Sequence, residues 1–97
     1  MKVFISGHYT NGDVAQNVAK AIYYANLFLE AGHYPYCPHL THFWHLIYPH
    51  EWEKWLKLDL EYLKVCDAYF RIPGSENSKG ANIEENEARR LGLKLFV

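Results

Sequence analysis

The sequence predicts an α/β fold with a parallel sheet of four to five strands and helices on both faces. Short apolar runs alternate with segments of helical spacing, in the order strand, helix, strand, helix, strand, helix, strand. This order is typical of a parallel sheet that helices cover. Most of the expected elements end at a glycine or a proline. The 97 residues leave room for one domain, which is expected to span residues 1–97.

The first half of the chain is expected to form two strands around one long helix. Residues 3–5 are a short apolar run and predict a buried first strand. A helix is expected from Asp13, a residue suited to the N-cap, to about Ala31, because apolar residues recur at helical spacing between them. Gly32 then ends this helix, and residues 34–37 predict a second short strand.

The second half contains one stretch without clear periodicity. Residues 39–50 carry four histidines and several aromatic residues in no regular pattern, and are expected to be a loop with at most a helical turn. The remaining expected elements are a helix over residues 49–65 with Pro49 in its first turn, a strand over 68–72, a helix over 78–91 and a strand over 94–97. Ligands of such sheets bind beyond the carboxyl ends of the strands, so the intervening loops should hold the functional site.

Composition and charge exclude several classes of function. The net charge is −1 and the ten basic residues form no run, which excludes the clustered Lys and Arg that a nucleic-acid polymer requires. No membrane association is expected, because the first apolar run is too short for a signal peptide or a membrane span. Cys37 and Cys66 make no disulfide framework, which indicates a reducing cytoplasm. A chain this short gains stability by association, so a homodimer or higher homo-oligomer is expected.

Asp59 breaks the pattern of the second long helix. At about 100° per residue, it falls on the apolar side, near Trp55, Leu56 and Leu63, while the other charged residues gather opposite. A carboxylate held against a core is costly unless it is paired or hydrogen-bonded. Asp59 is therefore expected either to cap a backbone group or pair with a buried tyrosine hydroxyl, or to take part in catalysis.

Glu84 shows the same anomaly on the last helix. It shares an inward stripe with Ala88 and Leu91, at positions i, i+4 and i+7. Glu87 lies near the edge of this inward stripe and is the main alternative to Glu84 as the functional carboxylate. Glu84 also lies in the first turns of its helix, where the macrodipole favours a negative charge, so we expect it to stay ionised and nucleophilic.

Two loops at the same edge of the sheet could bind an anion or a sugar. Ser78 and Gly80 flank the start of the last helix, where free backbone N–H groups bind anions, although the same residues also fit ordinary capping. The loop over residues 7–10 is compatible with a phosphate or sugar contact. It lacks the glycine spacing of a dinucleotide-binding fingerprint or a P-loop.

A cluster of histidines suggests either zinc or an aromatic surface. Cys37 and the following His39, His42 and His45 match no common zinc-ligand spacing, and no metal is expected. His42 and Trp44 could instead cover a flat ligand, since planar rings stack on a base and histidine can hydrogen-bond its edge. Packing of these rings over the sheet or at a subunit contact is an equally open interpretation.

Three groups of residues together resemble the nucleoside 2-deoxyribosyltransferase superfamily. They are Phe4, Ile5, Ser6 and Gly7 with Tyr9 and Thr10; Asp59 seven residues before Cys66, Asp67 and Ala68; and the series Ser78, Gly80, Ala81, Glu84, Ala88, Leu91 and Gly92. Within the superfamily, the chain is most similar to small phage and bacterial domains of unknown function and to the 2'-deoxynucleoside 5'-phosphate N-hydrolases. The resemblance covers nearly the whole chain.

The resemblance implies a flavodoxin- or Rossmann-like parallel sheet. It also implies cleavage of the N-glycosidic bond of a (deoxy)nucleoside or its 5'-monophosphate, by hydrolysis or deoxyribosyl transfer, through a covalent glycosyl-glutamate intermediate. Glu84 would be the nucleophile, and Asp59 would assist at the base or sugar. A buried Asp59 would keep its proton near neutral pH by desolvation, while the helix end keeps Glu84 charged. Ser78 and Gly80 would contact a 5' phosphate.

The loop after the first strand would line the same pocket. Gly7, His8 and Thr10 are expected to bind substrate, and Tyr9 is expected to take part in catalysis. The hydrolases carry a basic first loop, whereas this one contains no Arg, which leaves Lys79 as the only nearby cation. No cofactor is expected.

Two further functions remain alternatives to an enzyme. A non-catalytic module of the same fold could bind or sense a nucleotide, and an oligomeric structural protein could use the Trp-rich stretch as an interface. Two inward carboxylates favour the enzyme, because a pure binder has no reason to bury them.

Overall fold

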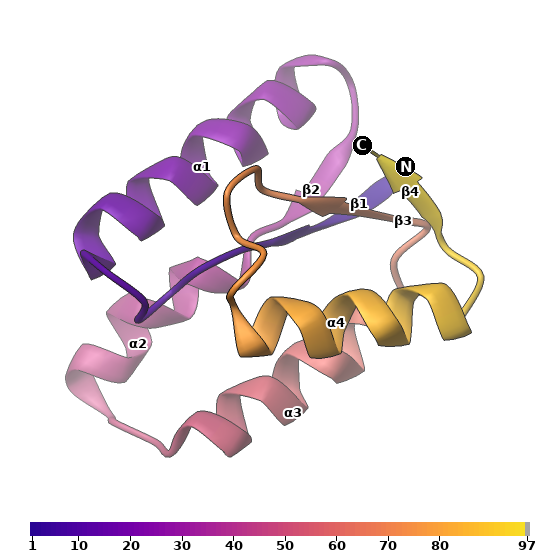
Figure 1. Ribbon diagram of the computed structural model, residues 1–97. Coiled ribbons are helices and arrows are strands. Elements are labelled where there is room, and N and C mark those ends of the chain that lie inside the picture. Colours follow the sequence, from indigo (N-terminus) through magenta and orange to yellow (C-terminus); the bar gives the residue numbers. More distant parts are fainter. Residues whose placement is uncertain (97) are drawn as a thin grey trace.

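Four parallel strands form a sheet in the order β2-β1-β3-β4 (Figure 1). The computed structural model describes residues 1–96. The strands are β1 (Lys2–Ser6), β2 (Tyr34–Tyr36), β3 (Ala68–Arg71) and β4 (Lys94–Phe96). The helices are α1 (Val14–Glu30), the short 3₁₀ helix η1 (Pro38–Leu40), α2 (Thr41–Ile47), α3 (Trp52–Leu63) and α4 (Lys79–Arg90). The predicted flavodoxin- or Rossmann-like α/β fold is confirmed, with four strands.

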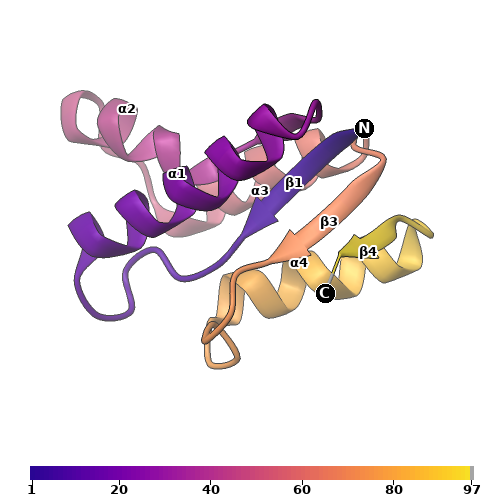
Figure 2. The same ribbon diagram turned by 90° about the horizontal axis from the view of Figure 1, so that it is seen from above.

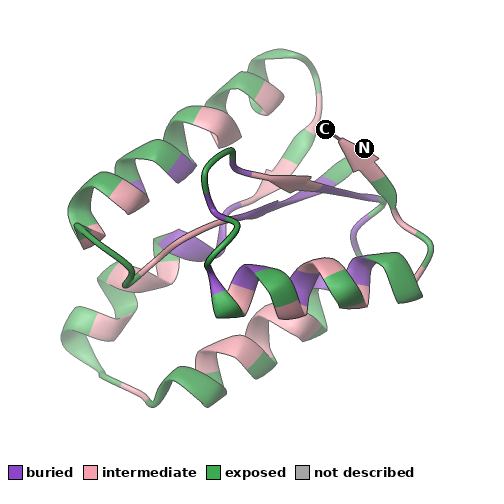
Figure 3. Cartoon of the chain, viewed as in Figure 1, coloured by how far each residue is buried: buried purple, intermediate pink, exposed green. Residues whose placement is uncertain are grey.

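Helices cover both faces of this sheet, with α1 on one side and α3 and α4 on the other (Figures 1 and 2). β1 divides the core because successive side chains of a strand point to opposite faces. Val3 and Ile5 pack on the α1 side with Ala21, while Phe4 packs on the other side with Leu63. Figure 3 shows that most of β1 and the first half of β3 are buried, while the helices carry exposed residues.

The strand order indicates where in the fold a ligand would bind. It matches the first four strands of the flavodoxin arrangement, in which ligands bind where the chain switches direction between β1 and β3. After β1 the chain crosses to the edge strand β2, and after β2 it crosses back beyond β1 to β3. The carboxyl ends of β1 and β3 therefore open a crevice between neighbouring loops.

The predicted helix caps are confirmed. The side chain of Asp13 accepts a hydrogen bond from Gln16 N at 3.1 Å, and Gly32 follows α1 with a φ of 90°. The side chain of Ser78 accepts from Ala81 N at 3.1 Å. Polar residues at these positions satisfy backbone N–H groups that no helical carbonyl can reach.

Two predicted boundaries were wrong. Residues 39–50 are not a loop, because η1 and α2 occupy most of them. The apolar residues Leu40, Phe43, Trp44 and Ile47 stand at the helical spacing i, i+3, i+4 and i+7, which the expectation of a loop overlooked. In the structure this stripe is exposed, and α2 buries none of its seven residues. α3 begins only at Trp52, after an extended Glu51, so Pro49 lies before the helix and not in its first turn. Residue 97, part of the expected last strand, lies outside the described residues.

None of the described helices combines the length and the apolar character that crossing a membrane requires.

Candidate functional site

A cavity of about 540 Å³ opens at the carboxyl edge of the sheet. The loop after β1, the η1–α2 segment, α3 and the start of α4 all contribute to its wall. Its volume lies within the range of about 300–1,000 Å³ that is usual for small-molecule sites. Eight of the ten predicted site residues line it: Gly7, His8, Tyr9, Thr10, Asp59, Ser78, Gly80 and Glu84.

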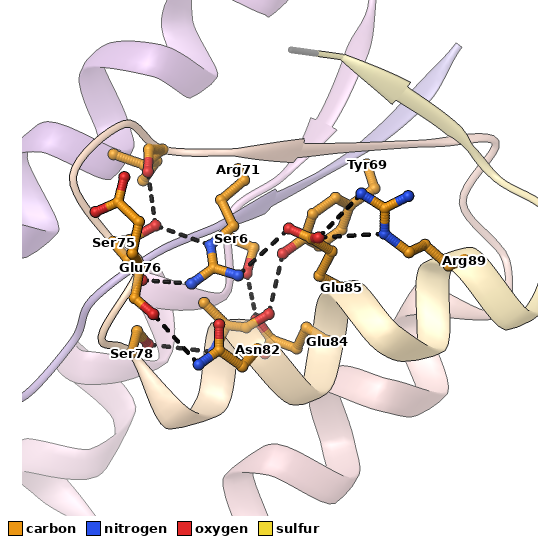
Figure 4. A network of polar contacts seen from close by, with 12 residues as sticks. Ser6, Tyr69, Arg71, Ser75, Glu76, Ser78, Asn82, Glu84, Glu85 and Arg89 are labelled. Carbon is orange, nitrogen blue, oxygen red and sulfur yellow. Dashed lines mark hydrogen bonds and ion pairs between the residues drawn. The ribbon is translucent and has the colours of Figure 1, made fainter.

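Glu84 lies in the second turn of α4 and is only 7% exposed. Its Oε1 accepts a hydrogen bond of 2.7 Å from Ser6 Oγ at the end of β1 (Figure 4). Ser6 was missed as a site residue, although a hydroxyl at the carboxyl end of a central strand was visible in the sequence. The competitor Glu87 does not line the cavity and pairs with Arg90 on the surface of α4.

The expectation that Glu84 stays charged was wrong for the free protein at neutral pH. Burial, together with the nearby charge of Asp59, raises the pKa of Glu84 to about 8. The hydrogen bond from Ser6 and the positive charge of Arg71 lower this pKa, but by less. The helix dipole acts mainly within the first turn, whereas Glu84 lies one turn further along and away from water.

Asp59 lines the same cavity from α3. Its Oδ1 is buried and has no hydrogen-bond partner among the described residues. Burial raises its pKa to about 7, as the apolar surroundings predicted. The alternative in which Asp59 caps a backbone group or pairs with a tyrosine finds no support, because no hydrogen bond satisfies this oxygen.

Within residues 1–96, three buried side-chain atoms lack a hydrogen-bond partner: Asp59 Oδ1, His8 Nδ1 and His39 Nδ1. All three residues line the cavity. His39 is 5% exposed, its Nε2 lies 2.7 Å from the His8 carbonyl oxygen, and burial lowers its pKa. The neutral ring therefore donates through Nε2 and leaves Nδ1 as an unmet acceptor. Each unmet buried group costs about 1–3 kcal/mol, so their concentration here indicates a place for a polar ligand.

The loop after β1 is held in place by neighbouring helices. Asn17 of α1 donates through Nδ2 to the carbonyl oxygens of Tyr9 and Asn11, each at 2.9 Å. The Tyr9 hydroxyl lies 2.6 Å from His42 Nδ1, and burial raises the pKa of Tyr9. Tyr9 therefore faces the cavity as a fixed, protonated phenol. Asn17 was missed because nothing in the sequence marks a contact across eight residues.

The predicted aromatic cover involves different residues from those expected. His42 and Trp44 do not line the cavity. His42 instead holds Tyr9, and Trp44 is 51% exposed with its ring edge-on to Trp55 at 5.1 Å. The aromatic and histidine rings that do line this side of the cavity are His45, His50, Trp52 and Trp55. Among the described residues, no three His, Cys, Asp or Glu side chains are placed to hold one metal ion.

Comparison with known proteins assigns the chain to a family. A family model described as a domain of unknown function (DUF7768) matches residues 1–97. The chain belongs to the DUF7768 family. Comparisons with curated proteins and with solved structures gave no match. The chemistry of this DUF7768 domain must therefore be inferred from the geometry of its cavity.

The end of the cavity at α4 carries little positive charge in the DUF7768 domain. Lys79 is the one Lys or Arg among the lining residues, and its Nζ lies 5.3 Å from the centre of the Trp52 ring. Arg71, at the end of β3, donates to Ser75 Oγ at 3.1 Å and pairs with Glu85 at 3.3 Å (Figure 4). Its charge is thus largely satisfied within the protein.

Gly7 has a packing role in the DUF7768 domain that the sequence did not reveal. A Cβ at this position would lie 2.8 Å from Ile72 Cδ1 and 3.0 Å from Ile72 Cβ. The first distance is shorter than real Cβ contacts and the second is tighter than most of them, so Ile72 would have to shift. Gly7 is therefore required for the close approach of the loop to the end of β3, whatever ligand the cavity binds.

Proposed function

We propose that this protein cleaves the N-glycosidic bond of a deoxynucleoside or its 5'-monophosphate, with Glu84 as nucleophile and Asp59 as proton donor to the base. One observation supports this above the others: two buried carboxyl groups with raised pKa values line a single cavity that has an aromatic wall. Glycoside-cleaving sites use such pairs, one group as nucleophile and the other as acid. The resemblance to the nucleoside 2-deoxyribosyltransferase superfamily supports the same assignment.

The proposed reaction has two steps. In the first, ionised Glu84 bonds to the anomeric carbon, the bond from that carbon to the base nitrogen breaks, and the proton of Asp59 neutralises the departing base. In the second, a water molecule or another base attacks the glycosyl ester and Asp59 accepts its proton, which regenerates Glu84. Water gives a hydrolase, and a second base gives a transferase.

The protonation of the pair suits this chemistry near neutral pH. With pKa values of about 7 for Asp59 and about 8 for Glu84, the pair carries one proton between these values. The productive arrangement places that proton on Asp59. Because the higher pKa belongs to Glu84, this arrangement is the minor one of the two in the free protein. The hydrogen bond from Ser6 stabilises the Glu84 carboxylate and so favours the productive arrangement, with the proton on Asp59.

The direct test is release of free base, measured by chromatography after incubation with the four common deoxynucleosides and their monophosphates. We expect base from at least one substrate, and no base with Glu84→Ala. Glu87→Ala is the matched control, because it removes a carboxylate from the same helix outside the cavity. Undiminished turnover by Glu84→Ala would refute the assignment.

A binding or sensing module without turnover is the second candidate. The raised pKa of Glu84 favours it, since a protonated carboxyl group at neutral pH donates a hydrogen bond and attacks poorly. This candidate predicts that a nucleoside or nucleotide raises the melting temperature of both the native protein and Glu84→Gln. Release of base on long incubation would exclude it.

A further inference from the structure

His45 is held in one tautomer by two hydrogen bonds. Its Nδ1 accepts from Trp55 Nε1 at 2.9 Å and from the backbone N of His50 at 3.1 Å. An indole N–H and a backbone N–H can only donate. Nδ1 must therefore carry a lone pair, and the ring hydrogen lies on Nε2.

The ring of His45 is also fixed in orientation. It lies edge-on to Trp55, with centroids 5.9 Å apart and an angle of 73° between the planes. Trp55 is itself in contact with His50, at 5.2 Å between centroids. His45 lines the cavity, and its Nε2 makes no hydrogen bond with any of residues 1–96 and is not among their buried unpaired atoms, so it is accessible to a ligand. The free protein thus offers an unused N–H donor from a rigid aromatic wall.

We propose that His45 is a specificity-determining residue, whose Nε2–H binds a carbonyl oxygen on the base and so selects carbonyl-bearing bases over amino-bearing ones. The inference rests on the proposed function, because it takes the ligand to be a nucleoside. A carbonyl oxygen accepts the hydrogen bond directly. An exocyclic amino group presents N–H groups to the same atom, so two donors would face each other.

His45 cannot adapt to an amino group by changing tautomer. The other tautomer would place a hydrogen on Nδ1, where it would face the N–H groups of Trp55 and His50. Two hydrogen bonds would be lost, and their donors would be left unmet. A site with a fixed donor discriminates by the cost of an unpaired group, which corresponds to about tenfold or more in affinity.

The test is a binding comparison in Glu84→Gln, where turnover is removed. Isothermal titration with 2'-deoxyinosine and 2'-deoxyadenosine compares two purines that differ in a carbonyl or an amino group at C6 and, with it, in whether the neighbouring N1 carries a hydrogen. 2'-Deoxyuridine and 2'-deoxycytidine provide the same comparison for pyrimidines. We expect the carbonyl member of at least one pair to bind about tenfold more tightly.

Two further substitutions in that background separate recognition from packing. His45→Phe removes the N–H donor. The ratio of the affinity for the carbonyl nucleoside to that for the amino nucleoside should then fall to within about threefold of unity. His45→Gln carries an amide that can present either a donor or an acceptor, so the ratio should fall while both ligands still bind. A merely structural role would weaken both ligands alike and leave the ratio unchanged.

Each outcome distinguishes the two proposals. If neither the nucleosides of the two pairs nor the four common deoxynucleosides and their 5'-monophosphates bind Glu84→Gln or the native protein, the proposed function fails and the inference with it. If nucleosides bind but both pairs bind equally, only the role of His45 is overturned. Nitrogen-15 NMR of the His45 ring gives a readout without ligand: we expect a protonated Nε2 and an unprotonated Nδ1, and the reverse would overturn the inference.

Discussion

Glu84→Gln should make the protein more stable, and the gain should grow as the pH rises. The glutamate has an ordinary pKa of 4.5, which burial raises to about 8 in the folded chain. The folded state therefore binds this proton more tightly than the unfolded state. Stability from this group is fully present below pH 4.5 and is lost as the pH rises through about 8. A glutamine has no proton to lose, and its side-chain oxygen can still accept from Ser6 Oγ.

The size of the effect follows from the pKa difference. Each pKa unit corresponds to about 1.36 kcal/mol, so the full change from 4.5 to about 8 corresponds to roughly 5 kcal/mol at most. Relaxation around the carboxylate reduces this value, and we expect the advantage of Glu84→Gln to grow by about 2 kcal/mol or more between pH 5 and pH 8.

Urea denaturation of both proteins at pH 5 and pH 8 measures this difference directly. Glu87→Gln is the control: Arg90 lowers the pKa of Glu87, so the folded and unfolded states have both lost this proton above about pH 5, and the effect of this substitution should change little between pH 5 and pH 8. An advantage of Glu84→Gln that is the same at both pH values would refute the view that burial dominates at Glu84.

Three further predictions concern the same cavity. If the protein releases base, the plot of kcat/KM against pH should be bell-shaped, with limbs near pH 7 and pH 8, which are the pKa values of the Asp59–Glu84 pair. A flat profile from pH 5 to pH 10 would contradict the assignment. Ser6→Ala removes a hydrogen bond that lowers the pKa of Glu84. In the same pH profile, the alkaline limb should therefore move to higher pH, while the acid limb, set by Asp59, stays in place. Gly7→Ala should destabilise the fold by about 1–3 kcal/mol in urea denaturation because its Cβ meets Ile72. Gly80→Ala, whose Cβ would lie at an ordinary 3.8 Å from Trp52, should be neutral or stabilising by up to about 1 kcal/mol, and an equal loss in both variants would contradict the packing argument.

Much of the fold follows from local physics. Asp13 and Gly32 mark the ends of α1 because a capping side chain and a positive φ are properties of single positions. Asp59 and Glu84 could be singled out because each interrupts an apolar helical stripe. The helix α2 was missed although Leu40, Phe43, Trp44 and Ile47 stand at helical spacing, and in the structure this stripe is exposed rather than packed on the sheet.

The sequence by itself determined the parallel α/β sheet and the two inward carboxylates, because residue spacing decides which face of a helix each side chain occupies. Only the tertiary structure decided how those carboxylates behave. The charge of Glu84 depends on its burial, on the hydrogen bond from Ser6 and on the charge of Asp59. These three residues lie on α4, β1 and α3, and only the folded chain brings them together. The tertiary structure likewise placed His45 rather than His42 in the cavity wall. Sequence spacing gives the direction of a side chain along its own helix, whereas pKa, tautomer and cavity depend on atoms contributed by other elements.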